Sequence, residues 1–125
     1  MYLLDTNICI YLMKGKYPAL AKRLFSLNPS EVFISAITVF ELQYGAEKSR
    51  WGERTKQKLA MFLTPFSILP FEENDACVAA TIRNNLEKNG TPIGSYDLQI
   101  AAQGLARDLT VVTHNTKEFG RVSGL

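Results

Sequence analysis

Four acidic residues, dozens of positions apart, have the type and setting to build a metal-dependent centre: Asp5, Glu41, Asp97 and Glu118. Asp5 and Asp97 are embedded in apolar stretches, and burying several ionised carboxylates together is costly unless a cation neutralises them. A hard divalent cation does so, and the oxygen ligands of Asp, Glu and Asn suit Mg²⁺ or Mn²⁺. The chain has one histidine and two scattered cysteines, so a zinc site is not expected.

The chemistry that such a centre suits is hydrolysis at phosphorus. A carboxylate-held Mg²⁺ with open water positions is typical of enzymes that act on phosphates, because the ion activates water and neutralises charge in an in-line displacement. The segment Gly90–Gly94 lacks the pattern of a phosphate-cradling Walker loop, which disfavours hydrolysis of a nucleoside triphosphate. No Ser-His-Asp or Cys-His arrangement stands out as a nucleophile.

Predicted strands and helices alternate along the chain. Apolar or β-branched runs predict strands at Tyr2–Leu4, Val32–Ile37, Ser67–Pro70 and Thr110–Thr113. Helices are predicted from Ile8 to near Gly15, from Pro18 to the Asn28-Pro29 break, from a cap at Thr38, and over Trp51–Phe62, Asp75–Asn89 and Ser95–Arg107, with a polar loop at His114–Lys117. This alternation predicts an α/β fold, in which a parallel sheet carries helices on both faces.

The order of these elements places the acids at one edge of the sheet. In open parallel sheets, ligands bind beyond the carboxyl ends of the strands, near helix starts. Asp5 ends the first strand, while Glu41 and Asp97 lie in first turns of helices. Asn115 and Glu118 follow the last strand. We therefore expect the four acids to converge.

Each acid also has a purely structural interpretation. Asp5 could cap the first helix, and Asp97 could interact with a helix dipole. Glu41 could complete a capping box with Thr38, and Glu118 could simply be solvated in a loop. The joint placement favours a shared site, because independent caps need not lie at the same end of a sheet.

Composition places the chain among ordinary soluble domains. A length of 125 residues predicts a single domain, and a net charge of +2 is too small to indicate nucleic-acid binding by itself. Two groups of basic residues could hold phosphates, although solvated helix faces are the commoner explanation: Lys14, Lys16, Lys22 and Arg23, and Lys48, Arg50, Arg54, Lys56 and Lys58.

No membrane or export signal is apparent, and cytoplasmic localisation is expected. The apolar start of the chain is interrupted at Asp5, so it contains no signal-peptide core, and no apolar run is long enough to span a bilayer. Cys9 and Cys77 lie in apolar runs, and each is predicted to be a small buried thiol in a reducing compartment.

Four blocks of the sequence closely resemble those of PIN-domain toxins of the VapC type: Leu3–Asn7, Ser35–Gly45, Pro92–Ala102 and Val112–Phe119. The blocks occur in the expected order and cover essentially the whole chain. The resemblance implies a three-layer PIN-like α/β/α sandwich with a central, mostly parallel sheet over residues 1–125. It further implies an endoribonuclease that depends on Mg²⁺ or Mn²⁺.

Residue by residue, the resemblance assigns the metal-site acids to Asp5, Glu41 and Asp97. Asp5 and Asp97 would be the main ligands, with Glu41 completing the pocket or binding a second ion. Thr6 or Asn7 matches the polar residue that steadies the first acid.

The last block departs from the family pattern, which often has a fourth acid there. His114 and Asn115 occupy part of that region, so Glu118 is the best remaining acid, with Asn115 as the neutral alternative. Fewer negative charges at this corner imply looser or water-mediated coordination of the metal. Relatives commonly continue a few residues beyond a pair such as Gly124–Leu125, so a terminal edge strand is expected to be short or missing.

The resemblance also implies partners. A VapB-like antitoxin would occupy the groove and block the metal site, often with a basic side chain, and the complex would bind its operator DNA through the antitoxin. The toxin would form a homodimer. Structured RNA is the expected substrate, with tRNA the most frequent class.

In the resulting mechanism, Glu118 or Asn115 orients a water that attacks phosphorus, leaving a 5′-phosphate and a 3′-hydroxyl. Lys14, Lys16 and Lys117 are weak candidates for holding the RNA backbone. Two rivals remain open. One is a catalytically silent PIN module that binds RNA or protein. The other is a metal-dependent phosphatase, or a nuclease with a DNA or other non-tRNA substrate.

Overall fold

A four-stranded parallel sheet forms the centre of the protein in the computed structural model, which describes all of residues 1–125. Its strands are β1 (Tyr2–Leu4), β2 (Val32–Ser35), β3 (Ser67–Leu69) and β4 (Thr110–Val112), in the spatial order β3-β2-β1-β4. Leu4 lies opposite Ile34 on one side and Val112 on the other. Helices connect the paired strands, as parallel pairing requires. No strand follows β4.

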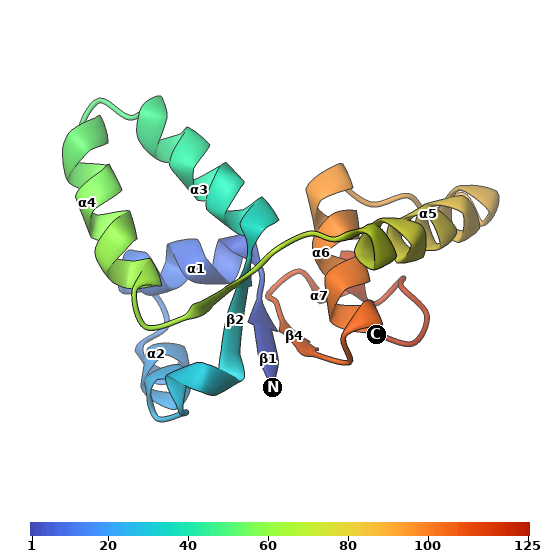
Figure 1. The fold of residues 1–125 in the computed structure, drawn as a ribbon, viewed down its shortest axis with the longest axis horizontal. Helices are drawn as coiled ribbons and strands as arrows, with labels where there is room; N and C mark the ends of the chain where they lie inside the picture. Colours follow the sequence, from blue (N-terminus) through green and yellow to red (C-terminus); the bar gives the residue numbers. More distant parts are fainter.

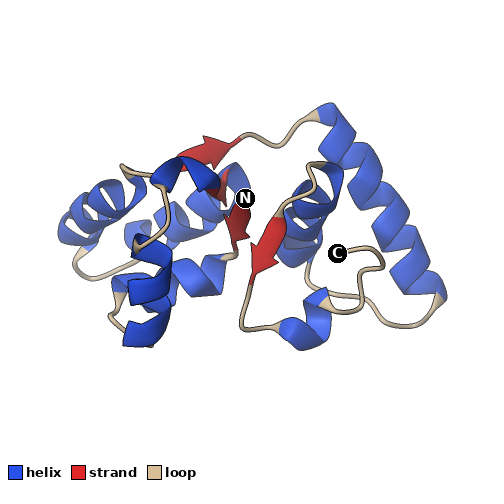
Figure 2. Ribbon diagram, turned by 90° about the horizontal axis from the view of Figure 1, so that it is seen from below, coloured by secondary structure: helices blue, strands red, loops and turns tan.

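Helices cover both faces of this sheet (Figure 1). They are α1 (Thr6–Met13), α2 (Pro18–Phe25), α3 (Ala36–Glu47), α4 (Gly52–Leu63), α5 (Glu73–Lys88), α6 (Ser95–Ala106) and α7 (Thr116–Phe119), with a 3-10 turn at Pro29–Glu31. The first four lie on one side of the strands and the last three on the other, as Figure 2 shows from below. None of them combines the length and the apolar character needed to cross a bilayer. The predicted three-layer α/β/α architecture is confirmed.

Two apolar clusters hold the layers together, one on each face of the sheet. Successive strand side chains point to opposite faces. Leu4 of β1 therefore packs in a cluster with Ile8 of α1, whereas the neighbouring Leu3 packs with Ile82 of α5 and Ile100 of α6. This arrangement fixes the direction of β1, and with it the position of the residue that follows Leu4.

The first helix ends at Met13, and Gly15, near which the sequence predicts its end, terminates it. This glycine adopts a left-handed backbone conformation (φ +71°), and its N–H donates to the carbonyl of Leu12 at 3.2 Å. The next N–H, from Lys16, donates to the carbonyl of Tyr11 at 2.9 Å. These two bonds form a Schellman motif, which satisfies the last carbonyls of α1 and turns the chain sharply toward α2.

The boundary between β2 and α3 differs from the prediction. The strand ends at Ser35 rather than Ile37, and the Ser35 hydroxyl accepts the N–H of Ile37 at 3.0 Å as the cap of α3. Thr38 is thus a fully buried residue inside the helix, and the predicted capping box between Thr38 and Glu41 is wrong. The β-branched residues that suggested a strand are accommodated in the helix, because packing outweighs their intrinsic preference.

Two smaller predictions are also corrected. The polar segment after β4 contains a short helix, α7, which Phe119 anchors by burying its ring in the core. Cys77 is exposed, whereas Cys9 is buried as expected. The reason is helical periodicity, since α5 buries Asp75, Ala79 and Ile82, and Cys77 lies off that face.

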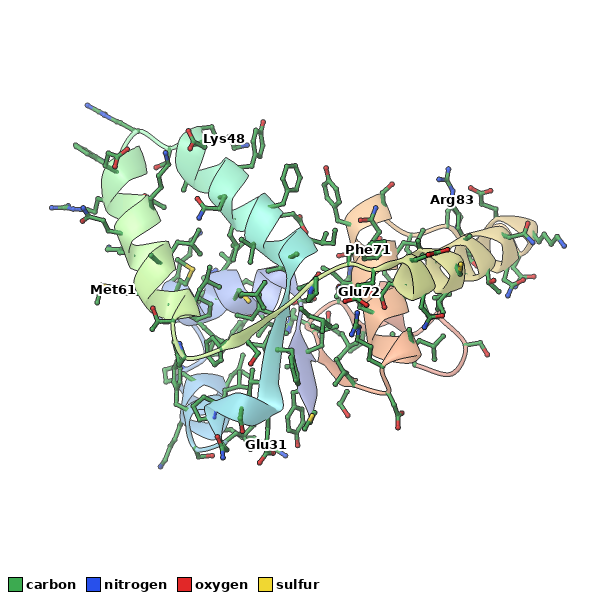
Figure 3. The ribbon with its side chains drawn as sticks, viewed as in Figure 1. Glu31, Lys48, Met61, Phe71, Glu72 and Arg83 are labelled. Carbon is green, nitrogen blue, oxygen red and sulfur yellow. The ribbon has the colours of Figure 1, made fainter.

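An ion pair between the buried Asp75 and the half-buried Arg107 joins α5 to the end of α6. Asp75 is 1% exposed and accepts the backbone N–H of Glu72 at 2.8 Å, completing a capping box at the start of α5. The guanidinium of Arg107 donates to the same carboxylate oxygen at 2.9 Å. Figure 3 labels Phe71 and Glu72 on the connection that leads from β3 into this corner.

Candidate active site

Asp5 begins the site at the carboxyl end of β1. Its side chain is 2% exposed, and its Oδ1 accepts the N–H of Ile8 at 2.9 Å, so it caps α1. Its Oδ2 accepts the hydroxyl of Thr113 at 2.5 Å. Burial raises the pKa of the Asp5 carboxyl, while these two hydrogen bonds and the nearby His114 act in the opposite direction. The structural interpretation of Asp5 as a cap is therefore correct but incomplete.

Glu41 reaches the same edge from α3. Its Oε1 accepts the hydroxyl of Thr6 at 2.8 Å, and the Thr6 hydroxyl lies 3.0 Å from that of the buried Thr38. These hydroxyls connect the starts of α1 and α3 and orient the half-buried Glu41 carboxylate. Thr6 thus steadies Glu41 rather than Asp5, and Asn7 is exposed.

Asp97 and Glu118 complete the cluster from α6 and α7. The pKa of the Asp97 carboxyl is raised to about 7 by burial, then by a hydrogen bond with Glu118, and then by the negative charges of Glu118, Asp5 and Glu41. Such mutual repulsion requires the four groups to lie close together. The structure therefore brings together the acids that the sequence singles out from four separate segments.

Asn115 and Glu118, which compete for the fourth corner in the sequence, act together in the structure. The Asn115 amide donates to Oε2 of Glu118 at 2.9 Å, which orients that carboxylate. The Asn115 backbone N–H donates to the Thr113 hydroxyl, also at 2.9 Å. Thr113 in turn donates to Asp5, so one network spans the end of β4 and the end of β1.

Sequence reasoning missed two members of this network, Thr113 and Thr38. Thr113 carries a signal that could have found it, because it directly follows the last strand, and the strand-end rule applies to it as it does to Asp5. Thr38 was interpreted as a cap, and only the end of β2 at Ser35 shows that its hydroxyl faces Thr6.

No lysine or arginine forms an ion pair with any of the four acids. A set of carboxylates with hydroxyl and amide partners alone matches the oxygen ligands that hard divalent cations prefer. The side chains as they stand form no closed group of three that could hold an ion. The fit to a divalent cation therefore rests on the chemistry of the donor set.

Basic residues lie at the margin of the acids. A pocket of about 550 Å³ between α1, α3 and α4 is lined by Glu41 together with Lys14 and Lys58. Lys117 is exposed on α7. Another hollow, of about 570 Å³ between α5, α6 and the C-terminal segment, contains none of the four acids.

Comparison with known proteins agrees with this geometry. The PIN-domain family profile matches residues 2–125. The tRNA(fMet)-specific endonuclease VapC of Shigella flexneri is 41% identical over 124 residues, which cover 99% of this chain and 93% of that protein. Two solved structures are also similar. DNA-bound VapBC from Salmonella typhimurium has 41% identity and a TM-score of 0.94, and the match covers 99% of this chain and 93% of the other. VapBC2 from Rickettsia felis bound to a promoter DNA fragment has 36% identity and a TM-score of 0.93, and the match covers 99% of this chain and 94% of the other.

A parallel α/β/α sandwich with acids gathered at the carboxyl edge of its sheet defines a nuclease of the PIN class, and such nucleases in general depend on divalent metal ions. The chain belongs to the PIN-domain family, within its VapC-type ribonucleases.

Proposed function

We propose that this protein is the toxin of a VapBC-type toxin–antitoxin pair, an Mg²⁺- or Mn²⁺-dependent endoribonuclease that cuts structured RNA, with tRNA as the first substrate to test. One observation carries the proposal. Four acids from four segments share one edge of the sheet, and no lysine or arginine of the chain forms an ion pair with them. The tRNA-specific relative from Shigella flexneri supports the choice of substrate.

Asp5 and Asp97 are the main metal ligands in this proposal, and Glu41 completes the pocket. Asp5 is suited to that role because its two oxygens are fixed, one by the Ile8 N–H and one by Thr113, so little ordering is needed on binding. Thr6 fixes Glu41 in the same manner. The groups that donate these hydrogen bonds lie in α1 or directly after β4, so the secondary structure holds the ligand positions rigid.

The cleavage step then needs few other groups from the chain. A bound divalent ion supplies a lowered pKa for water and neutralises the developing negative charge of the phosphate. Glu118, held by the Asn115 amide, orients the attacking water in line with the bond that breaks. The products are a 5′-phosphate and a 3′-hydroxyl. Lys14, beside Glu41 in the pocket between α1, α3 and α4, contacts the RNA backbone.

A VapB-like antitoxin is the proposed inhibitor. Both solved relatives named above are VapBC complexes bound to DNA, which supports operator binding through the antitoxin. The acids that lack a basic partner offer a place for one lysine or arginine of an inhibitor, which would exclude the metal by charge compensation. A homodimer of the toxin is part of the same proposal.

The proposal is tested with purified protein and total tRNA. Cleavage should require Mg²⁺ or Mn²⁺, stop with a chelator, and fall by on the order of 100-fold or more in Asp5→Asn, since a proposed ligand of the ion that neutralises the reacting phosphate is lost. Asp108→Asn is the matched control. Asp108 is an exposed aspartate outside the site with φ +55°, a conformation that asparagine also tolerates.

Two outcomes would contradict this function. Cleavage that survives the chelator or the Asp5 substitution would remove the metal mechanism. If no RNA or DNA is cut under any condition while an antitoxin still binds, the protein is a silent binding module, which is the remaining alternative. Cleavage of DNA or of an RNA other than tRNA would keep the mechanism and replace the substrate.

A further inference from the structure

Three aromatic rings gather on the surface next to the acids. Tyr17 and His114 are stacked, with ring centroids 5.7 Å apart and planes inclined by 23°. Tyr11 meets both rings edge-on, at 5.3 Å from Tyr17 and 6.0 Å from His114. The rings come from α1, from the residue before α2, and from the residue after Thr113. Segments distant in sequence thus meet at this cluster.

The cluster borders the acidic edge directly. His114 follows Thr113, whose hydroxyl donates to Asp5 at 2.5 Å, and it precedes Asn115, which holds Glu118. His114 is also close enough to Asp5 to lower the pKa of that carboxyl. A molecule stacked on these rings would therefore lie beside any phosphate that reaches the acids.

Tyr17 is held in an unusual conformation. Its φ of +54° is left-handed, a region that bulky residues rarely occupy, and its side chain makes no hydrogen bond to cap α2. Such conformations persist where the surroundings enforce them, and they concentrate at functional positions. Tyr17 is still 48% exposed, so the surface that it presents is open to a ligand.

A cation accompanies the rings. The ammonium group of Lys16 lies 5.7 Å from the centroid of the Tyr11 ring. Lys16 and Tyr17 are consecutive in the sequence, and the Schellman motif at Gly15 places both at the exit of α1. Aromatic surface together with a neighbouring positive charge is the combination that binds single-stranded nucleic acid, by stacking on the base and pairing with the phosphate.

We propose that Tyr17 and His114 form a stacking subsite that holds one unpaired RNA base beside the cleavage site, with Lys16 contacting the adjoining phosphate. This inference rests on the proposed ribonuclease function and adds to it the residues that position the substrate. Because the bases of a duplex are stacked on one another, such a subsite selects a loop or another single-stranded segment of a structured RNA. Tyr17 and His114 act as positioning residues, and the acids carry out the chemistry.

Other exposed aromatic residues lack this combination. Phe40 and Tyr96 meet edge-on at an interplanar angle of 66° and form no stacked pair. Trp51 has the Arg50 guanidinium 5.4 Å from its ring, but it lies in the turn between α3 and α4, at the far end of α3 where Figure 3 labels Lys48. Trp51 is therefore a matched control: an exposed ring with a cation, remote from the acids.

Binding is measured in an Asp97→Asn background, so that the probe is not cut. The probe is a single-stranded RNA of about eight nucleotides that contains 2-aminopurine, whose fluorescence is quenched by stacking. Tyr17→Leu should weaken binding roughly tenfold and relieve the quenching, because the loss of one base–aromatic stack has that effect. Tyr17→Phe keeps the ring and should restore both readouts, while Trp51→Leu should change neither.

His114→Gln is the second variant, because it removes the other ring of the stack without touching the left-handed position. Folding of each variant is checked by urea denaturation. The subsite is refuted if Tyr17→Leu and His114→Gln, both folded, bind and quench the probe as the parent does. Failure of the wider function has a different signature, since the parent would then cut no tRNA even though Tyr17-dependent quenching is present.

Discussion

Two buried aspartates, Asp5 and Asp75, differ in their charged partners. Asp5 is 2% exposed and Asp75 is 1% exposed, and each accepts a backbone N–H at the start of a helix. Asp75 also pairs with the Arg107 guanidinium at 2.9 Å. Asp5 has the neutral Thr113 hydroxyl in place of a guanidinium, and it lies close enough to Asp97 to raise the pKa of that acid, while the nearby His114 lowers the pKa of Asp5 itself.

This difference separates a structural carboxylate from a functional one. Transfer of a charge out of water is costly, and Asp75 meets that cost within the chain, through a guanidinium that also donates to the Pro70 carbonyl at 3.3 Å. At the acidic edge, the carboxylates lie near one another and repel, and no lysine or arginine of the chain pairs with them. We infer that the missing positive charge comes from outside, as a metal ion or as a basic side chain of an inhibitor.

The sharpest test replaces a carboxylate by an amide at each of the two places, with Asp97→Asn at the acidic edge and Asp75→Asn in the ion pair. Asp97→Asn should reduce RNA cleavage by on the order of 100-fold or more, because a proposed ligand is lost, while the metal-free protein keeps or gains stability as repulsion falls. Asp75→Asn should lower stability and leave cleavage unchanged. The free energy of unfolding of this variant should fall by about 2 kcal/mol, since a charged hydrogen bond is lost, and the cleavage rate per folded molecule should stay the same. Urea denaturation in chelator and initial cleavage rates measure the two effects.

The comparison fails if the two substitutions have the same signature. A loss of stability in metal-free Asp97→Asn comparable to that of Asp75→Asn would make Asp97 a structural carboxylate. A loss of cleavage in fully folded Asp75→Asn would extend the functional site to the junction of α5 and α6.

A second effect on stability is expected from the metal alone. In the proposed function Mg²⁺ or Mn²⁺ binds the folded protein through groups that the unfolded chain does not hold together, so a concentration of about 100 Kd should stabilise it by roughly 2.7 kcal/mol. The Tm should rise with metal concentration in the parent and in Asp75→Asn. A rise of equal size in Asp97→Asn would show that the ion binds elsewhere.

The contrast between the two aspartates also marks what the sequence could predict. The strand-end rule located Asp5, and the same rule with helix starts located Asp97, because chain direction and local periodicity determine those positions. Glu41 was expected in the first turn of its helix, and that prediction is wrong, because α3 begins at Ala36 and Glu41 lies beyond its first turn. The pairing of Asp75 with Arg107 is different. It joins residues 32 positions apart through the packing of α5 on α6, and no local pattern encodes it.

The roles of the hydroxyl groups were equally hard to predict from the sequence. Ser35 and Thr38 are both plausible caps, and only the register of β2 decides that Ser35 ends the strand and that Thr38 is buried. The sequence likewise presented Asn115 and Glu118 as alternatives. Their joint role depends on the short helix α7, which is anchored because Phe119 is buried in the core.

The last predicted effect is a pH dependence that distinguishes the acidic edge from the ion pair. In the metal-free protein the pKa of Asp97 is about 7, against an ordinary value of 3.8. Between these values the folded protein binds more protons than the unfolded chain, so its stability should fall as the pH rises and level off above about pH 7. The pKa of Asp5 is raised in the same direction. In chelator, the urea midpoint should therefore be lower at about pH 8 than at about pH 5.

Asp97→Asn should flatten that slope, because the substituted side chain does not titrate, whereas Asp75→Asn should leave it in place. Metal should act against the proton, since both compete for the same carboxylates, so the stabilisation by Mg²⁺ should grow over the same pH range. A midpoint that rises with pH in chelator, or a slope that Asp97→Asn does not alter, would mean that the four acids are not close enough to repel one another. The edge of the sheet would then have no need of a cation.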